Sequence, residues 1–414
     1  MSRAIRNKLQ NLLIVLLSVT AALLFWESRH LSQGNGALSS LFSTPAAPVS
    51  DTATAEIASL PLRFAVAGPY AAYGGLGMTT ADEDFSAAGA LLREALGSAS
   101  RRQAASREEL LSALRGGSAA YYDFLAPLPA SLLGRHLNCE VPQGLSTVRR
   151  LLLSLEEDGV ILYCGTEGAY SRYETRVSGE DLSALVNDCQ LSGVSFAAQL
   201  SQAEGLNPLS LLPGDEALSV PQLSAASCTA ESTLWSLLGF NPRTNSRYAE
   251  SDGTQVILEG ESTLRLQPGA VVRYESSGTG ISLSGQASFT AGEAVEAGGR
   301  FLTLLLQSCG SGAGLLLREA SPTLDGWRLL FDYHAGGYPI RSGSGAAMAS
   351  LTLRGTEVTE LELPLRRYTV TEEASPLLPL TQALAIARRC AGAELVIGYL
   401  DGGGETLSAG WLAE

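Results

Sequence analysis

Few side chains in this chain of 414 residues could carry out acid–base, nucleophilic or metal chemistry. Its three histidines are His30, His136 and His334, which are too few for an ordinary histidine-based zinc site. Lys8 is its single lysine, so the sequence beyond it offers neither a Ser–Lys dyad nor a lysine for a Schiff base. A metal site would therefore have to consist of carboxylates.

A nucleophile could come from serine or cysteine. The run Ser342–Gly345 lies close in sequence to Asp332 and His334, which are the residue types of a serine hydrolase, but the G-x-S-x-G spacing is absent. We interpret the run as a flexible turn between strands. Cys164 or Cys309 could pair with His334 only if the fold brought them together, so we interpret both as buried thiols.

Paired carboxylates and glycine-rich runs are the remaining candidates. Glu156–Glu157 and Glu372–Glu373 could suggest a glycosidase, but adjacent residues of a strand point to opposite faces and cannot flank one bond. We expect them to be solvated turn charges. The runs Gly74–Gly77 and Asp401–Gly404 lack the lysine and the spacing of phosphate-binding loops, so we interpret both as turns. The sequence thus predicts no catalytic, cofactor-binding or metal-binding residue, and we expect the protein not to be an enzyme.

The cysteines are widely spaced and form no C-x-x-C pair, which argues against zinc ribbons and thioredoxin chemistry. An even number would allow up to three disulfides in an oxidising compartment. They could equally be small buried apolar residues. The six are Cys139, Cys164, Cys189, Cys228, Cys309 and Cys390.

The elements that would position these residues begin with a hydrophobic segment, Leu9–Trp26. As a helix it would be roughly 27 Å long, close to the hydrocarbon thickness of a bilayer. Arg3, Arg6 and Lys8 precede it, which favours a cytoplasmic N-terminus. The alternative is a cleaved signal peptide, but residues 25–29 are bulky or charged and no A-x-A-like site follows. We therefore predict a single-pass plasma-membrane protein whose C-terminal domains are extracytoplasmic.

The charge of the chain restricts its partners. The formal net charge is −14, and the cytoplasmic tip holds three of the cations, so the outer part is more acidic still. Such a surface repels phosphate backbones and anionic lipids. Nucleic acid is therefore excluded as a partner, and contact with the membrane is assigned to the N-terminal helix.

The pattern beyond the anchor predicts an α+β fold with two or three domains, in which helices pack on one face of antiparallel sheets. Residues 27–60 are rich in Gly, Ser, Ala, Thr and Pro and predict a flexible stalk. The domain assignment is a cytoplasmic tip at 1–8, the transmembrane helix at 9–26, the stalk at 27–60, an N-terminal α+β ectodomain at 61–225, a helix plus β-meander region at 226–286, and a C-terminal α+β domain at 287–414.

Hydrophobic periodicity and turn residues predict the individual elements. Expected helices are 84–96, one capped by Ser106 and Glu109, 181–186, 229–238, one capped by Thr290 and Glu293 that runs to about 308, and 379–390. Expected strands include 62–67, 120–125, 148–155 and 160–164, then a meander of 246–250, 255–259, 262–266 and 271–274. Later strands turn at 324–326, 335–337 and 354–356, and a final hairpin joins 394–400 to 406–412.

Scattered motifs in the second half resemble the YycH/YycI family. They are Phe240–Pro242, Tyr248, Ser251–Thr254 and Leu264–Leu266, followed by Tyr368–Pro379 before a helix and a closing hairpin with Tyr399 and Trp411. The resemblance implies a single-pass accessory regulator that restrains a membrane sensor histidine kinase controlling cell-wall metabolism, partly through its transmembrane helix.

Ser18, Ala21 and Ala22 are small residues through which the predicted helix could pair with another helix, although they could equally face lipid. The expected partner is a membrane sensor kinase or a related single-pass regulator. We therefore expect a membrane-anchored extracytoplasmic protein that regulates a kinase or another envelope complex by protein–protein contact. The alternatives are an anchored hydrolase acting on peptidoglycan and a ligand-binding ectodomain.

Overall fold

The computed structural model describes residues 60–68, 72–166, 169–189, 194–213, 219–229, 232–241, 243, 246–390 and 392–414. All of them belong to one compact unit, Asp51–Glu414. The expected membrane segment Leu9–Trp26, its residues Ser18, Ala21 and Ala22, and the stalk lie outside the described residues except for Leu60. Among the residues that are described, no helix is long and apolar enough to cross a membrane.

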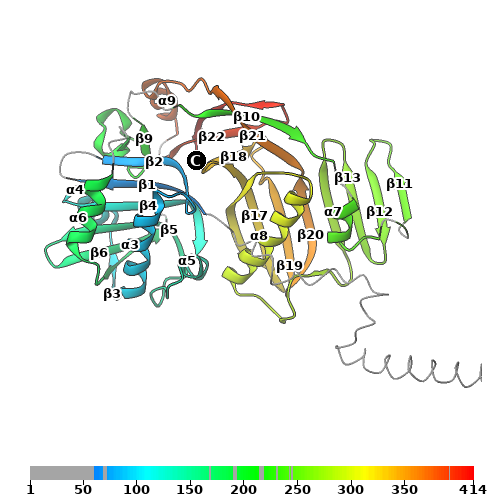
Figure 1. The fold of residues 1–414 in the computed structure, drawn as a ribbon, viewed down its shortest axis with the longest axis horizontal. Coiled ribbons are helices and arrows are strands. Elements are labelled where there is room, and N and C mark those ends of the chain that lie inside the picture. Colours follow the sequence, from blue (N-terminus) through cyan, green and yellow to red (C-terminus); the bar gives the residue numbers. More distant parts are fainter. Residues whose placement is uncertain are drawn as a thin grey trace, which may run out of the picture. The chain divides into compact units, whose positions relative to one another are not determined.

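The described chain is α+β with antiparallel sheets, as predicted (Figure 1). Seven of the described strands form a first sheet in the order β2-β1-β4-β5-β6-β7-β3. Their bounds are β1 Pro61–Ala67, β2 Ala72–Thr79, β3 Ser100–Ala105, β4 Ala119–Pro129, β5 Thr147–Glu156, β6 Gly159–Thr166 and β7 Ala169–Glu174. The expected strands at 62–67, 120–125, 148–155 and 160–164 are all present, and the second of these is longer than expected.

Helices lie against both faces of the first sheet, not against one as expected. They are α3 Phe85–Ser98, α4 Arg107–Arg115, α5 Ala130–Leu137 and α6 Gly179–Asp188. On one face, the hydroxyl of Tyr122 donates to the carbonyl of Ala88 in α3 at 2.9 Å. On the other, Ser154 donates to the carbonyl of Ala113 in α4 at 3.0 Å. Tyr122 pairs with Leu151, three residues from Ser154, so strand alternation puts the two contacts on opposite faces.

Twelve of the described strands form a larger sheet, whose main path is β11-β12-β13-β14-β20-β19-β17-β18-β22-β24. The predicted meander is confirmed as β11 Ser246–Ala249, β12 Gln255–Glu259, β13 Ser262–Gln267 and β14 Val271–Ser276. The others are β15 Ile281–Ser282, β16 Gly314–Pro322, β17 Gly326–Ala335, β18 Tyr338–Ser342, β19 Ala349–Arg354, β20 Glu357–Pro364, β22 Leu395–Asp401 and β24 Ala409–Ala413. The β18–β22 pairing is parallel.

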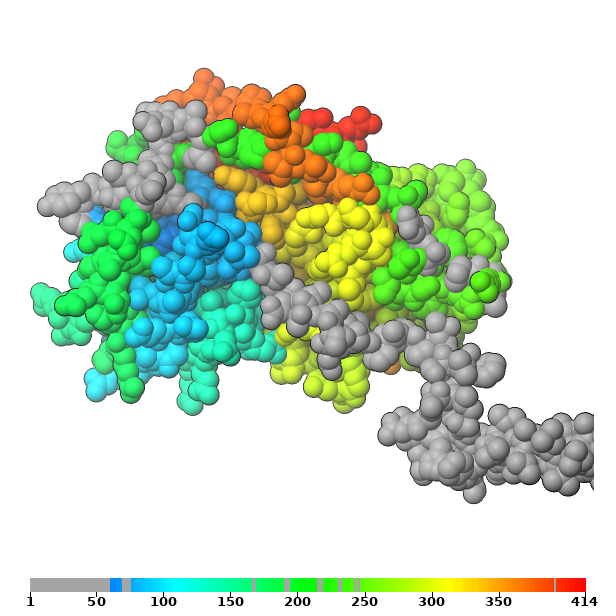
Figure 2. All heavy atoms as spheres, viewed as in Figure 1, coloured from blue at the N-terminus to red at the C-terminus, as the bar shows by residue number. Residues whose placement is uncertain are grey.

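Around β13, β14 and β20, this larger sheet has one apolar and one polar face. Leu264, Tyr274 and Leu361 are buried cross-strand neighbours beneath α7 Ser232–Leu237 and α8 Ala291–Ser308. On the opposite face, Arg273 pairs with Glu362 at 3.0 Å in solvent. Figure 2 shows α8 at the surface, between the helices that cover the first sheet and the residues of the meander. The capping box of Thr290 and Glu293 is confirmed at the start of α8.

Smaller elements connect the two large sheets. The strands β8 Val194–Phe196 and β9 Leu211–Pro213 pair with each other, and η1 Ala197–Gln199 and η2 Ser201–Ala203 lie between them. A further sheet of described strands has the order β21-β10-β23, with β21 Arg366–Ala374, β10 Pro221–Ser227 and β23 Thr406–Leu407. The last helix is α9 Leu380–Ala387. Thus β23 and β24 divide the expected strand 406–412 between two sheets.

Three sequence predictions need correction here. Gly74–Gly77 is not a turn but part of β2, because Gly74 pairs with Ala65 and Gly75 pairs with Phe64 of β1. Glu372–Glu373 is exposed as expected, yet it lies within β21 and not in a turn. The helix predicted at 379–390 ends at Ala387.

All six cysteines are in the described part of the chain, and the structure joins none of them in a disulfide. Cys164, Cys228 and Cys309 are buried, as apolar residues of that size would be. Cys390 is exposed.

Candidate functional site

A row of charged side chains crosses the apolar interior of the first sheet. Arg63 on β1 pairs with Asp123 on β4, which in turn pairs with Arg150 on β5. Directly paired residues of antiparallel strands share a face, so these three side chains lie side by side. Each of them is at most 2% exposed.

Glu394, immediately before β22, completes this row from a position 331 residues away from Arg63. Its carboxylate accepts from Arg63, from Arg150, and from Arg149 Nη2 at 2.7 Å. Asp123 accepts from Arg63 and, at 3.4 Å, from Arg149 Nε. We call Arg63, Asp123, Arg149, Arg150 and Glu394 the buried charge network.

The electrostatics of the network keep it ionised. Burial opposes the charged form of Asp123, but the guanidinium groups of Arg63, Arg149 and Arg150 outweigh burial and hold the pKa of that carboxyl well below its usual range. Burial alone would lower the pKa of Arg63, yet Asp123 and Glu394 raise it further above its ordinary value. Three guanidinium groups face two carboxylates, so the network carries one excess positive charge.

A bulge in β4 connects Asp123 of the network to the residues that line a cleft. The register of β4 against β5 shifts between Asp123 and Leu128. Within it, Leu125 has φ 64°, a left-handed conformation uncommon for a branched residue, and its N–H donates to Asp123 Oδ1 at 2.9 Å. The buried carboxylate thus fixes the shape of the segment that forms one wall of the cleft.

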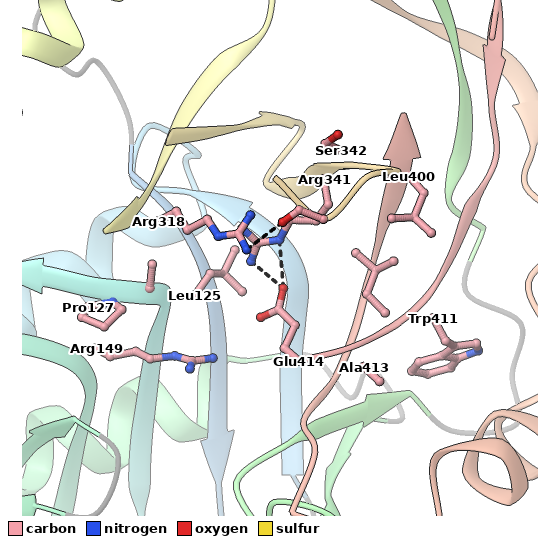
Figure 3. A pocket seen from close by; sticks show the side chains of 13 residues that line it. Leu125, Pro127, Arg149, Arg318, Arg341, Ser342, Leu400, Trp411, Ala413 and Glu414 are labelled. Atoms are coloured by element: carbon pink, nitrogen blue, oxygen red, sulfur yellow. Dashed lines mark hydrogen bonds and ion pairs between the residues drawn. The ribbon is translucent and has the colours of Figure 1, made fainter. Parts of the chain in front are cut away.

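The cleft has a volume of about 540 Å³, within the range of small-ligand sites. One wall comes from the first sheet and the other from β16, β18, β22 and β24 of the larger sheet. Figure 3 shows Arg149, Arg318 and Arg341 around the same space, with Leu400 and Trp411 farther along it. The lining residues are Leu125, Ala126, Pro127, Arg149, Arg318, Arg341, Ser342, Gly345, Leu400, Trp411, Leu412, Ala413 and Glu414.

Arg341 is the central cation of the second wall. Its Nε and Nη2 donate to Glu414 Oε1 at 3.0 and 2.5 Å, and its Nη1 donates to the buried Asp332. Burial acts to lower the pKa of Arg341, but Glu414 and Asp332 outweigh it and raise that pKa. Arg318 is farther out: its Nη2 donates to the carbonyl of Gly345 at 3.1 Å, and its Nη1 is 3.8 Å from Asp332 Oδ2.

The residues of the possible serine hydrolase do not assemble into a triad in the described structure. Asp332 binds Arg341 and the N–H of Met348, while the hydroxyls of Ser342 and Ser344 are 2.8 Å from each other. His334 is buried, its Nδ1 has no hydrogen-bond partner among the described residues, and burial lowers its pKa to about 4. Of these residues, Ser342 lines the cleft and Asp332 supports its wall through Arg341; in the described structure they form no charge-relay system.

The remaining candidates serve structural contacts. Burial raises the pKa of the Cys164 thiol, which disfavours a thiolate there. Glu156 accepts from the hydroxyl of Tyr163 at 2.6 Å and from Arg172 at 3.3 Å. The run Asp401–Gly404 is confirmed as a turn, in which Asp401 accepts from Gly403 N–H and pairs with the side chain of Arg366. In the described ranges, no group of three or more His, Cys, Asp or Glu side chains could hold a metal ion.

Sequence reasoning missed the charge network and the arginines of the cleft. The available signal was the position of charged residues inside apolar strands: Leu62-Arg63-Phe64 and Tyr122-Asp123-Phe124 each enclose one charge. Such residues are rarely fully buried unless they are paired. That signal indicates a buried pair without identifying its partners.

No protein-family model matches the sequence, and no curated protein matches it. The resemblance to the YycH/YycI family therefore stays a prediction.

Proposed function

We propose that the protein is a membrane-anchored, non-enzymatic regulator of the bacterial envelope that modulates a sensor histidine kinase or another membrane complex by contact. The observation that supports this role best is the Arg-lined cleft between the two large sheets. Arg149 and Arg341 are held by the buried carboxylates of Glu394 and Asp332, which fixes two of its cations in place.

The same pairing argues for binding over turnover. A general acid or base needs a group whose pKa lies near the working pH and which can reach the substrate. Asp332 and His334 do not line the cleft: Asp332 is bound to Arg341, and burial lowers the pKa of His334 to about 4. A binding domain needs only a defined arrangement of charge and apolar surface, which this cleft supplies.

In this proposal the N-terminal segment makes the contact through which the protein regulates its partner. Leu9–Trp26 anchors the protein, and Ser18, Ala21 and Ala22 provide a face of small residues for close contact with another helix. Occupancy of the cleft and pairing of the helix would then favour the same state of the partner, since a ligand shifts an equilibrium only by its differential affinity for the two states.

The test replaces Ser18, Ala21 and Ala22 together by isoleucine in the full chain and measures an envelope-stress reporter and recovery of the partner from detergent-solubilised membranes. We expect the reporter to change and recovery to fall. The matched control replaces Leu13, Leu16 and Leu17 by isoleucine, which changes the same number of residues in the same segment. Equal behaviour of both variants and the unmodified chain would refute regulation through this helix face.

A further inference from the structure

We propose that the cleft binds a carboxylate carried on a short apolar body, which displaces the side chain of Glu414 from Arg341. The inference rests on the binding role proposed above and assigns its ligand class. Three features of the cleft support it: an internal carboxylate on Arg341, an outer arginine with little pairing, and an apolar floor beside the cations.

The first feature is the contact between Glu414 and Arg341. Two nitrogens of one guanidinium donate to the same carboxylate oxygen at 3.0 and 2.5 Å, inside the cleft and not on a flat surface. Arg341 keeps its buried partner Asp332 whether or not Glu414 is in place. When the carboxylate of the ligand replaces that of Glu414, Arg341 therefore still has a carboxylate partner on each side. The exchange avoids the usual cost of leaving a buried ion unpaired.

The second feature is the gradient of exposure among the arginines. Arg149 and Arg341 have side chains only 10% and 17% exposed, whereas that of Arg318 is 40% exposed. The separation of 3.8 Å between Arg318 and Asp332 exceeds a normal hydrogen-bond distance. Arg318 can therefore donate to an incoming carboxylate without breaking a short ion pair.

The local charge also favours an anion. Among side chains, the two walls and the network behind them contain five guanidinium groups and four carboxylates: Arg63, Arg149, Arg150, Arg318 and Arg341 against Asp123, Asp332, Glu394 and Glu414. This excess of positive charge lies in a chain of net charge −14. Arginine is the side chain best suited to a carboxylate because its fork of donors matches the two oxygens.

The third feature is the apolar floor, which determines what carries the carboxylate. Leu125, Pro127, Leu400 and Leu412 line the same cleft as the arginines. Leu400 is 57% exposed, an unusually open position for a leucine at the end of a sheet strand. An apolar group attached to the carboxylate would cover it, and burial of apolar surface adds to affinity. A bare inorganic anion would gain nothing from this half of the cleft.

The experiment measures binding to the full chain in detergent by titration calorimetry. The probe is N-acetyl-leucyl-leucine, which has a carboxylate and two apolar side chains, and the paired control is its C-terminal amide. We expect the acid to bind about tenfold or more tightly than the amide. Titration of each compound into the same detergent buffer without protein corrects for partition into micelles, which is weaker for the charged acid than for the neutral amide. Inorganic phosphate should bind more weakly than the acid; equal or tighter phosphate binding would overturn the assignment of the apolar body.

Variants locate the site within the cleft. Arg318→Gln should weaken binding of the acid about fivefold or more, and Glu414→Gln should strengthen it, because the internal competitor loses its charge. The matched control is Arg328→Gln, on an exposed strand position outside the cleft, which should leave binding unchanged. Equal binding of acid and amide, no binding of the acid, or no tightening by Glu414→Gln would each overturn the proposal.

This outcome is separable from that of the proposed function. Loss of the reporter response in the isoleucine variant, together with no binding of the acid, would retain the regulator and reject the ligand class. Binding of the acid without any effect of the helix substitutions would retain the ligand class and reject regulation through the helix.

Discussion

Glu394 accepts from three guanidinium groups, and its replacement is the sharpest test of the buried charge network. Glu394→Gln would leave Arg63, Arg149 and Arg150 with Asp123 as their remaining carboxylate partner in the network. Removing one partner from a buried pair costs roughly 3–5 kcal/mol, so we expect the free energy of unfolding to fall by about that amount. Urea denaturation followed by circular dichroism measures it.

The control for this change is Glu275→Gln in the exposed pair with Arg265, whose atoms are 3.3 Å apart. Solvent screens that pair, and we expect little change in stability. Similar urea midpoints for Glu394→Gln and the unmodified chain would contradict a structural role for the network.

His334 gives the chain a pH dependence of stability with a definite sign. Burial lowers its pKa from 6.5 to about 4, so between these values the unfolded chain binds the proton and the folded chain does not. The contribution of neutral His334 is therefore complete above pH 6.5 and is lost as the pH falls toward 4. The shift corresponds to at most about 3.5 kcal/mol.

The measurement compares urea unfolding of the unmodified chain and of His334→Gln from pH 7.5 to pH 5. This range avoids the capping residues Glu109 and Glu293, whose pKa values are lowered from 4.5 by hydrogen bonds, so that their contributions are lost only at more acidic pH. We expect stability to fall with pH in the unmodified chain and to change less in the variant. Parallel slopes would assign the pH dependence to other groups.

At the scale of elements, the sequence predicts helix caps and turns correctly, because residues close together in the chain determine them. Ser106 with Glu109 and Thr290 with Glu293 form complete capping boxes, because each requires only residues three positions apart. The turns expected at 335–337 and 354–356 also form, since Gly336, Gly337 and Gly355 have positive φ, a backbone conformation that other residues seldom adopt.

Non-local pairing decided the features that sequence reasoning missed. Gly74–Gly77 looked like a turn because glycine favours turns, but pairing with β1 draws it into a strand. The partner of Arg63 in the network, Glu394, is 331 residues away, and no periodicity in the sequence predicts that contact. Likewise, β10 pairs with β21 and β23, which come much later in the chain. Pairings of this kind depend on how whole sheets pack, not on local propensity.

Helix α8 offers a prediction at this scale because it packs closely on the larger sheet through a glycine. A Cβ atom at Gly298 would lie 2.7 Å from Leu329 Cδ1 and 2.9 Å from Leu351 Cδ2. Gly298→Leu should therefore lower the free energy of unfolding by about 1–3 kcal/mol, despite the better helix propensity of leucine. Urea denaturation measures the change.

The matched control is Gln307→Leu, which places the same side chain on an exposed position of the same helix. We expect it to be neutral or mildly stabilising. If both variants unfold at the same urea concentration as the unmodified chain, the helix does not pack on Leu329 and Leu351 as described.

At the scale of the compact unit that the structure describes, a close contact between the two large sheets sets the width of the cleft. The turn between β17 and β18 meets β2, where a Cβ atom at Gly337 would lie 2.3 Å from the backbone nitrogen of Met78. On the other side of that contact, a Cβ atom at Gly77 would lie 2.4 Å from the ring of Tyr338. Glycine at both positions lets the sheets approach until Arg341 on β18 faces the bulge of β4.

The adjacent glycines of this turn allow a matched test of that idea. Gly336 and Gly337 have φ of 54° and 77°, so alanine at either position carries a similar backbone strain of about 1–2 kcal/mol. Only Gly337→Ala adds a clash, since no heavy atom lies within 4 Å of a Cβ atom at Gly336. We expect Gly337→Ala to be about 1–3 kcal/mol less stable than Gly336→Ala in urea denaturation. It should also bind N-acetyl-leucyl-leucine more weakly, because the walls of the cleft move apart. Equal stability and equal binding of the two variants would show that the contact at Met78 does not hold the sheets together.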